Sequence, residues 1–240
     1  MFIPKDTNRQ RITQLEITIE NCEKYNLTYD SFGNKKLYGR IRQPHRTFDV
    51  KISGIAETGL DIFEEYTDYP FSAVMLRVQT ALTQPGEKLS AYHQSLKLGR
   101  FDGDYEKALH IMRSLPQAFT YRKGATAVHE TAENAFAIGS GVCQDYAHIM
   151  TALLRAEHIP ARYVVGMIPG EGASHAWVEA LCSGYWYGFD PTNNKLVNDE
   201  YIKVSCGRDS GDCSVIRGSF YGSAEQTQNE FILVNQVDKI

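Results

Sequence analysis

The sequence predicts an α+β fold, in which a long apolar helix packs on an antiparallel sheet behind a β-sandwich-like N-terminal domain. Three observations support this. Apolar and polar positions alternate through the first third of the chain, helical periodicity begins near residue 85, and two strand-like runs follow a helix expected over 143–157. Helices followed by consecutive strands are typical of an α+β core. We expect a domain over 1–80 and a second over 81–240.

The N-terminal domain is predicted to consist of short antiparallel strands. Apolar and polar residues alternate in ITQLEITIEN (12–21) and in TFDVKISGIAET (47–58), and KLYGRI (36–41) follows a turn signal at Gly33-Asn34. Strands at this spacing are typical of a sandwich layer. Because the region holds no cluster of His, Cys or paired carboxylates, we interpret it as a structural or substrate-flanking domain.

Helical patterns dominate the next stretch. PGEKLSAYHQSLKLG (85–99) predicts a helix that ends at Gly99, and DGDYEKALHIMRSLPQAF (102–119) predicts a second. ETAENAFAIGSG (130–141) predicts a short third helix that closes on glycines. The helix over 143–157 follows, and its apolar positions predict that it is buried.

Strands are predicted beyond that helix. Pro160 prevents the helix from continuing, and ARYVVGMI (161–168) is strand-like. SHAWVEAL and GYWYGFDPT are two further strand-like runs, and the turn signal Ser183-Gly184 between them predicts an antiparallel hairpin. The tail over 200–240 is rich in turn residues and ends in the strand-like EFILVNQV.

Bulk composition narrows the functional classes. The chain has 240 residues with a net charge of −4, which gives no support for a nucleic-acid partner. No apolar run reaches the roughly 18 residues of a membrane helix, so no membrane partner is expected. The first residues lack the apolar core of an export signal, and five cysteines are an odd number, so we expect free thiols and a cytoplasmic location. The cysteine spacing does not predict a metal site.

Cys143 is the cysteine whose context predicts chemistry. It follows a glycine-rich segment and begins the predicted buried helix. A thiol at a helix N-terminus faces unpaired backbone N–H groups and the positive end of the helix dipole, which stabilise a thiolate. The same N–H groups can stabilise the oxyanion that forms when a thiolate attacks an amide carbonyl. Cys143 is therefore the candidate nucleophile.

His175 and Asp190 are the candidate partners of that thiol. His175 begins one strand of the predicted hairpin and Asp190 ends the other, so the hairpin places their side chains together. An imidazole can serve as the base for a thiol, and a carboxylate can orient the imidazole. His148 is a rival base, but it lies five residues after Cys143 and points to a different face of the helix. We therefore assign His148 to packing or hydrogen bonding.

Taken together, these motifs resemble one family. The runs GxGVCQDYAHIMTALLRAxHIPARYVVG, SHAWVEA and WYGFDPTN are similar to the bacterial transglutaminase-like superfamily of cysteine-protease-like proteins. The resemblance implies a papain/transglutaminase-like core with Cys143, His175 and Asp190 as its catalytic triad. Family members carry another strand-forming segment before the point where this chain begins, so the resemblance also implies a shortened N-terminal domain or an internal start.

The function expected from these residues is thiol-dependent acyl transfer, or hydrolysis of an amide or peptide bond through a thioester. The resemblance favours a cysteine protease or amidase acting on a peptide, protein or small amide. The alternatives are a protein-glutamine transglutaminase and a noncatalytic peptide-binding or protein-binding module. No cofactor is expected, and calcium dependence is not predicted because the sequence has no calcium-binding loop of the EF-hand type. The candidate substrate contacts are Tyr121, Gln144, Trp177 and Asn193, for each of which a packing, turn or solvated role is an open alternative.

Overall fold

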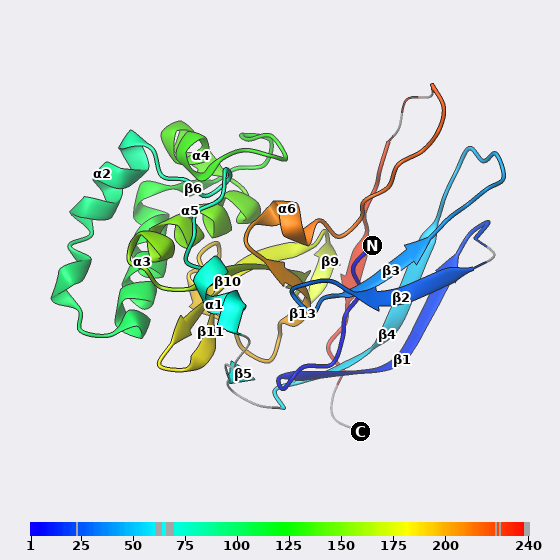
Figure 1. Cartoon of the computed structure of the whole chain (residues 1–240), viewed down its shortest axis with the longest axis horizontal. Helices are drawn as coiled ribbons and strands as arrows, with labels where there is room; N and C mark the ends of the chain where they lie inside the picture. The colour runs from blue at the N-terminus through cyan, green and yellow to red at the C-terminus, as the bar shows by residue number, and fades with distance from the viewer. Residues whose placement is uncertain (23, 61–63, 66–69, 224, 226, 238–240) are drawn as a thin grey trace.

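The computed structural model describes residues 1–22, 24–60, 64–65, 70–223, 225 and 227–237. A central antiparallel sheet lies between a group of helices and a separate layer of N-terminal strands (Figure 1). This is the α+β architecture that the sequence predicts. Among the described helices, none combines the length and the apolar composition that crossing a membrane requires.

The central sheet has the strand order β12-β11-β10-β8-β13, and β5 also pairs with β11. Neighbouring strands are antiparallel throughout. The predicted hairpin is confirmed, because Cys182 pairs with Tyr185 around a turn in which Ser183 and Gly184 both have positive φ. The strands of this sheet are β5 (Glu64–Glu65), β8 (Ala161–Met167), β10 (His175–Cys182), β11 (Tyr185–Asp190), β12 (Lys195–Leu196) and β13 (Ile202–Gly207).

The central helix of the fold is α5 (Cys143–Ala156), as predicted. It lies against β8 and β10, and α2, α3 and α4 lie around it. Every residue of α5 from Asp145 to Arg155 is buried, which explains why its apolar positions are not confined to one stripe. The other described helices are α1 (Pro70–Met75), α2 (Glu87–Ser95), the 3-10 turn η1 (Leu98–Arg100), α3 (Asp104–Ala118), α4 (Ala132–Ile138) and α6 (Ser210–Cys213).

The predicted end of the first helix at Gly99 is wrong. Helix α2 ends at Ser95, and Lys97 takes a left-handed conformation before the 3-10 turn. Leu96 and Leu98 are both buried on either side of Lys97. A continuous helix would point these two leucines in different directions. The early end of the helix allows both of them to be buried.

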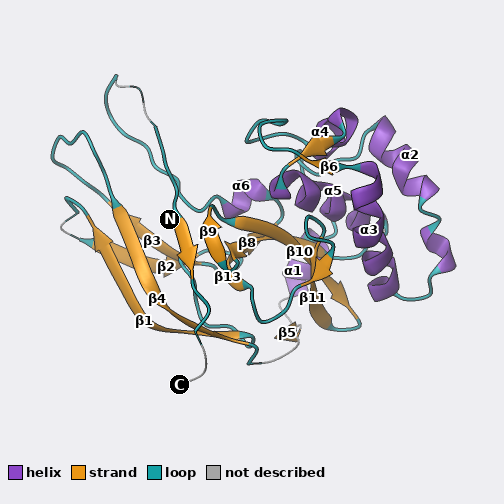
Figure 2. Cartoon of the chain, turned by 180° about the vertical axis from the view of Figure 1, so that it is seen from behind, coloured by secondary structure: helices purple, strands orange, loops and turns teal. Residues whose placement is uncertain are grey.

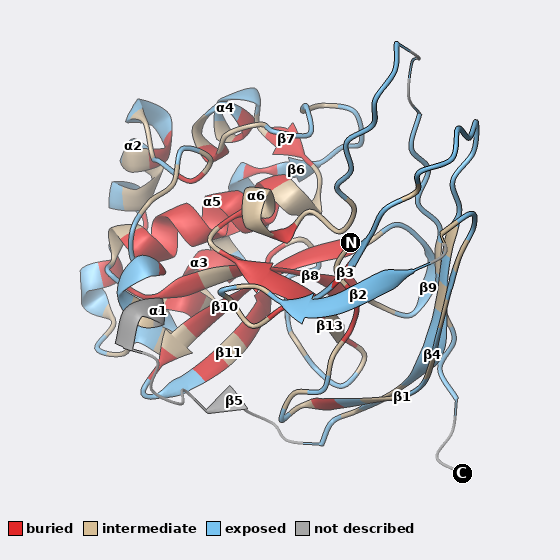
Figure 3. Ribbon diagram, turned by 45° about the vertical axis from the view of Figure 1, so that its right-hand side comes forward, coloured by how far each residue is buried: buried red, intermediate tan, exposed pale blue. Residues whose placement is uncertain are grey.

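The N-terminal layer contains the three predicted strands together with an unpredicted one, β2 (Tyr25–Tyr29), and the four form two antiparallel pairs. β1 (Gln10–Ile19) pairs with β4 (Val50–Thr58), and β2 pairs with β3 (Lys35–Gly39). This layer is mostly exposed or half-buried, whereas the central sheet and α5 are mostly buried (Figure 3). The core of the protein therefore lies between the sheet and the helices.

Two buried amide side chains attach the N-terminal layer to the edge strand β13. The Asn34 amide donates to the carbonyl of Cys206 at 2.7 Å, and its oxygen accepts from the Cys206 N–H at 2.8 Å. Gln10 pairs in the same way with the carbonyl and N–H of Lys203, each at 2.8 Å. Each amide thus replaces one residue of a neighbouring strand, and together they cover an edge that would otherwise have unpaired backbone groups.

The C-terminal segment returns to the centre of the molecule. Its strand β14 (Ile232–Val234) pairs with β9 (Gly170–Gly172), which lies just before His175 in the chain (Figure 2). β14 confirms the strand predicted in EFILVNQV. β13 is a strand that the sequence analysis did not predict. One further short pair, between β6 (Thr120–Tyr121) and β7 (Ser140–Gly141), is parallel.

Candidate active site

Cys143 is the first residue of α5, and its side chain is half-buried. Val142 before it is extended and forms the N-cap. The backbone N–H groups of a first helical turn have no partner within the helix, so those of Cys143 and Gln144 are suited to bind a developing oxyanion. The structure therefore gives the thiol the helix-start environment that the sequence predicts.

A buried carboxylate fixes the segment that carries Cys143. Oδ2 of Asp145 accepts hydrogen bonds from the Val142 N–H and the Thr126 hydroxyl, both at 2.7 Å. A Cβ atom on Gly141 would lie 2.2 Å from the same oxygen, so only glycine permits this close approach. Burial raises the pKa of Asp145, against the hydrogen bonds from Val142 and Thr126. Sequence reasoning missed this role, although an acidic residue three positions after an N-cap is a known signal.

The hairpin brings His175 and Asp190 into contact. Nε2 of His175 lies 2.8 Å from Oδ2 of Asp190, and both side chains are buried. Because a carboxylate only accepts, the proton of this hydrogen bond belongs to Nε2. An interaction with the Cys143 side chain also acts on the pKa of His175, and Nδ1 is the ring nitrogen that Asp190 leaves free.

The electrostatics of the three groups favour a charged imidazole. Burial on its own lowers the pKa of His175, but hydrogen bonds and charge interactions with Asp190 and Cys143 outweigh burial and raise the pKa to about 9. Burial also acts to raise the pKa of Asp190. The hydrogen bond and the charge interaction with His175 outweigh burial, and further hydrogen bonds add to them, so the pKa of Asp190 lies below its ordinary value. His175 is therefore protonated and Asp190 ionised near neutral pH.

Asp190 also binds residues other than His175. Its Oδ2 accepts from the Tyr201 hydroxyl at 2.6 Å and from the Asn193 amide at 2.7 Å. Its Oδ1 accepts from the backbone N–H groups of Thr192 and Asn193, at 3.0 and 3.1 Å. Sequence reasoning missed Tyr201, since it precedes the unpredicted strand β13 and no local motif marks it.

The four candidate substrate contacts lie in different environments. Tyr121 is exposed. Its pKa is raised, chiefly by the partial burial of its side chain and secondly by the charge of Cys143. Gln144 donates to the carbonyl of Val128 at 2.7 Å and so holds the loop after Tyr121. Asn193 binds Asp190. Trp177 is only 1% exposed and packs edge-to-face on Tyr201, so it fills the core rather than lining an open surface.

His148, the rival base, is buried away from solvent. Its Nε2 accepts from the Ser210 N–H at 3.1 Å, and its ring packs against Tyr163. Burial lowers the pKa of His148 to about 4. These contacts agree with its assignment to packing and hydrogen bonding.

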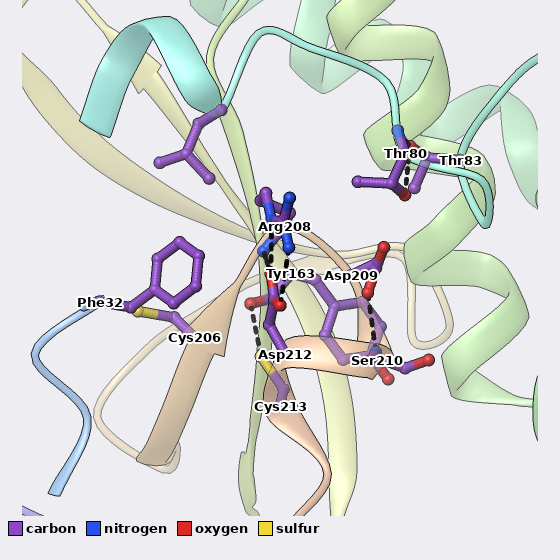
Figure 4. A network of polar contacts seen from close by, with 12 residues as sticks. Phe32, Thr80, Thr83, Tyr163, Cys206, Arg208, Asp209, Ser210, Asp212 and Cys213 are labelled. Atoms are coloured by element: carbon purple, nitrogen blue, oxygen red, sulfur yellow. Dashed lines mark hydrogen bonds and ion pairs between the residues drawn. The ribbon is translucent and has the colours of Figure 1, made fainter. Parts of the chain in front are cut away.

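The polar segment that contains α6 packs beside Tyr163 (Figure 4). Arg208 forms a bidentate ion pair with Asp212, at 2.8 and 3.0 Å. The Cys213 thiol lies 3.6 Å from the carbonyl of Tyr163, and Asp209 caps α6. Cys206 and Cys213 are both free thiols. In the part of the chain that the structure describes, no group of three His, Cys, Asp or Glu is arranged to hold a metal ion.

Comparison with known proteins identifies the domain that holds this site. Residues 95–191 match the model of the transglutaminase-like superfamily, and the match includes Cys143, His175 and Asp190. The segment over 95–191 is therefore a transglutaminase-like domain, which confirms the resemblance seen in the sequence motifs.

Two solved structures share the fold. A candidate cysteine protease from Cytophaga hutchinsonii superposes with a TM-score of 0.72 at 22% identity, covering 88% of this chain and 76% of its own. The periplasmic domain of TgpA from Pseudomonas aeruginosa superposes with a TM-score of 0.50 at 16% identity, covering 80% and 75%. At these identities the likeness is one of fold.

Mycobacterial relatives match along most of their length. An uncharacterised protein of Mycobacterium tuberculosis strain H37Rv is 28% identical over 256 residues, which cover 93% of this chain and 81% of that protein. An uncharacterised protein of Mycobacterium leprae is 26% identical over 246 residues, which cover 91% and 84%. The similarity thus extends beyond the transglutaminase-like domain to the N-terminal layer.

Proposed function

We propose that this protein is a cysteine-dependent hydrolase, a protease or amidase, that cleaves amide bonds through a thioester on Cys143. The observation that carries the proposal is an imidazole bound to a buried carboxylate: His175 binds Asp190 at 2.8 Å, and the helix-start Cys143 is among the groups that raise the pKa of His175. The raised pKa of His175 supports an imidazolium at neutral pH, which can give a proton to a leaving amine.

The first half of the reaction forms the thioester. The Cys143 sulfur attacks the amide carbonyl carbon, and the carbonyl π electrons move to oxygen, where the first-turn N–H groups of α5 stabilise the negative charge. As the carbonyl re-forms, the carbon–nitrogen bond breaks, and the His175 imidazolium gives its Nδ1 proton to the leaving amine. Asp190 keeps the ring oriented by holding Nε2–H.

The second half regenerates the enzyme. The neutral His175 ring takes a proton from water as the water oxygen attacks the thioester carbon. The carbon–sulfur bond then breaks, the acid is released and Cys143 leaves as the thiolate beside the protonated His175. Amide plus water thus becomes acid plus amine.

An amine in place of that water would make the protein a transglutaminase. Hydrolysis is preferred here because the Cytophaga hutchinsonii protein that shares the fold over most of this chain is a candidate cysteine protease. A noncatalytic peptide-binding module is the second alternative. It would not require a histidine that binds a buried carboxylate and whose pKa is raised by a helix-start thiol, so the site argues against it.

Thiol reactivity tests the nucleophile. We expect iodoacetamide at neutral pH to label Cys143 faster than Cys22, the other partly accessible cysteine, because only Cys143 has an imidazolium partner. Peptide-resolved mass spectrometry measures both rates in one sample, with Cys143→Ala and Cys22→Ala as matched variants. Equal rates for the two cysteines would refute an activated nucleophile.

A substrate screen tests the reaction. Peptide and small amide libraries are incubated with and without a primary amine, and products are identified by mass spectrometry. Hydrolysed products that require Cys143 and that persist when amine is present support the hydrolase. Amine conjugates as the main product would establish the transglutaminase alternative instead, and no Cys143-dependent product would favour the binding module.

The proposal extends to the setting of the site. We propose that residues 1–80 form a supporting domain that holds β13 in place through Gln10 and Asn34. We also propose a cytoplasmic location, in keeping with the free thiols of Cys206 and Cys213. TgpA, by contrast, has its similar domain in the periplasm.

A further inference from the structure

Tyr201 is a buried residue whose hydroxyl points at the carboxylate of the candidate triad. Its Oη donates to Oδ2 of Asp190 at 2.6 Å, and its side chain is almost fully buried. The ring packs edge-to-face on Trp177, with centroids 5.3 Å apart, and lies 6.3 Å from the His175 ring. The packing of the Tyr201 ring therefore fixes the position of its hydroxyl.

The oxygen that Tyr201 binds is the one that faces His175. Oδ2 of Asp190 accepts from the His175 Nε2, the Tyr201 hydroxyl and the Asn193 amide, whereas Oδ1 accepts from backbone N–H groups. A carboxylate with this many donors is fixed in rotation and stabilised in its charged form. Asn193 lies three residues from Asp190 in the same turn, but Tyr201 comes from a separate segment before β13.

We propose that Tyr201 is a positioning residue, whose hydroxyl keeps Asp190 ionised and aligned with His175. This rests on the proposed function of the Cys143 site. When Asp190 takes up a proton, the buried imidazolium loses its anionic partner, and His175 no longer supports Cys143 as a nucleophile. Tyr201 therefore extends the reactive state of Cys143 to lower pH.

Among the described residues, the charged groups that lie against this assembly are those of the triad and of the Lys195–Glu200 pair. His175 and Tyr201 both bind Oδ2 of Asp190, and the charge of Cys143 acts on His175. The Lys195 ammonium lies over the Tyr201 ring, 5.2 Å from its centroid, and is paired with Glu200 at 2.9 Å. The Lys195–Glu200 pair is exposed, so solvent weakens its influence on Asp190.

The test is the pH dependence of Cys143 alkylation by iodoacetamide, followed by mass spectrometry from about pH 4 to about pH 10 to span carboxyl and imidazole titration. In Tyr201→Phe, which keeps the ring and removes the hydroxyl, we expect the acid limb of the rate profile to move up by about one pH unit. Tyr146→Phe is the matched control, because it removes a buried hydroxyl that, among the described residues, binds the carbonyl of Phe119 and not Asp190. That control should leave the acid limb unchanged.

Several outcomes decide the proposal. An unshifted acid limb in Tyr201→Phe, or equal shifts in both variants, would overturn it, because a purely structural hydroxyl affects stability and not the titration. In the Asp190→Asn background, removing the Tyr201 hydroxyl should cause no further shift. Should Tyr201→Phe not fold, a fluorotyrosine placed at 201 strengthens the donor without changing the packing, and the limb should then move down; no movement contradicts the proposal.

The same data separate this inference from the proposed function. If His175→Ala and Asp190→Asn leave Cys143 no less reactive than in the unsubstituted protein, the proposed function fails. If both slow the alkylation while Tyr201→Phe keeps an unshifted profile, the proposed function stands and only the role of Tyr201 fails.

Discussion

His175 and Asp190 meet diagonally across the β10–β11 hairpin, with Nε2 and Oδ2 2.8 Å apart. The pair farthest from the turn is Val178 with Phe189. One residue further along each strand, Asp190 lies opposite Trp177. Side chains of one strand alternate between faces, so His175 shares the face of Trp177 two residues away, at a spacing that a long side chain can span. The contact therefore depends on the length and register of this hairpin.

Asp190→Asn should lower the pKa of His175 from its value of about 9, because the amide removes the negative charge that offsets burial of the ring. The effect can be measured by NMR titration of the His175 imidazole. His93 serves as an internal reference, since it pairs with Glu157 at the far end of α5. A His175 pKa that is unchanged in Asp190→Asn would contradict the coupling.

The same coupling makes stability depend on pH. The pKa of His175 is raised from 6.5 to about 9 in the folded protein, so its stabilising contribution is complete below pH 6.5 and is lost as the pH rises through about 9. Urea unfolding across this range should show a loss of stability in the native protein. The loss should be smaller in His175→Gln, which has no titrating ring. Parallel curves for the two proteins would argue against the raised pKa.

Asn34→Ala should destabilise the protein by about 2 kcal/mol, because it leaves the buried N–H and carbonyl of Cys206 without partners. Asn26→Ala is a control of the same residue type on the exposed strand β2, and it should change stability by no more than about 0.5 kcal/mol. Chemical denaturation measures both free energies of unfolding. Similar values would show that the amide pairing with β13 contributes little.

Arg155→Met should destabilise the protein by about 3 kcal/mol, since the guanidinium joins four separate segments. Arg113→Met, on the exposed side of α3, is the matched control and should be nearly neutral. Urea denaturation of both variants provides the comparison, and a small effect at Arg155 would mean that water replaces its contacts. The acceptors of Arg155 are the carbonyls of Leu76, Ala161 and Arg208 and the hydroxyl of Thr83.

Local patterns predicted the elements that carry Cys143, His175 and Asp190. Helix α5 follows from apolar periodicity with glycines before it, and the hairpin follows from two strand-like runs around Ser183-Gly184. Both signals lie within short stretches of sequence. The His175–Asp190 contact could therefore be predicted, because it is formed within a single hairpin.

Contacts between distant segments could not be predicted in this way. β13 pairs with β8 from about forty residues away. Its sequence IKVSCG alternates apolar and polar residues, but it is short and lies in a tail rich in turn residues, so no strand is predicted there. Tyr201 reaches Asp190 only because β13 occupies that position. The pairing of Asn34 with Cys206 joins residues 172 positions apart, and a polar side chain in a turn gives no sign that it is buried.

The attachment of Gln10 and Asn34 to β13 has a consequence for synthesis on the ribosome. The first strands of the chain are made early, but the backbone groups that they bind belong to Lys203 and Cys206. The N-terminal layer therefore cannot bind β13 until most of the chain has emerged from the ribosome. Tyr201 lies just before β13 and is translated equally late, so a nascent chain cannot complete the hydrogen bonds of Asp190 before residue 201 has been added.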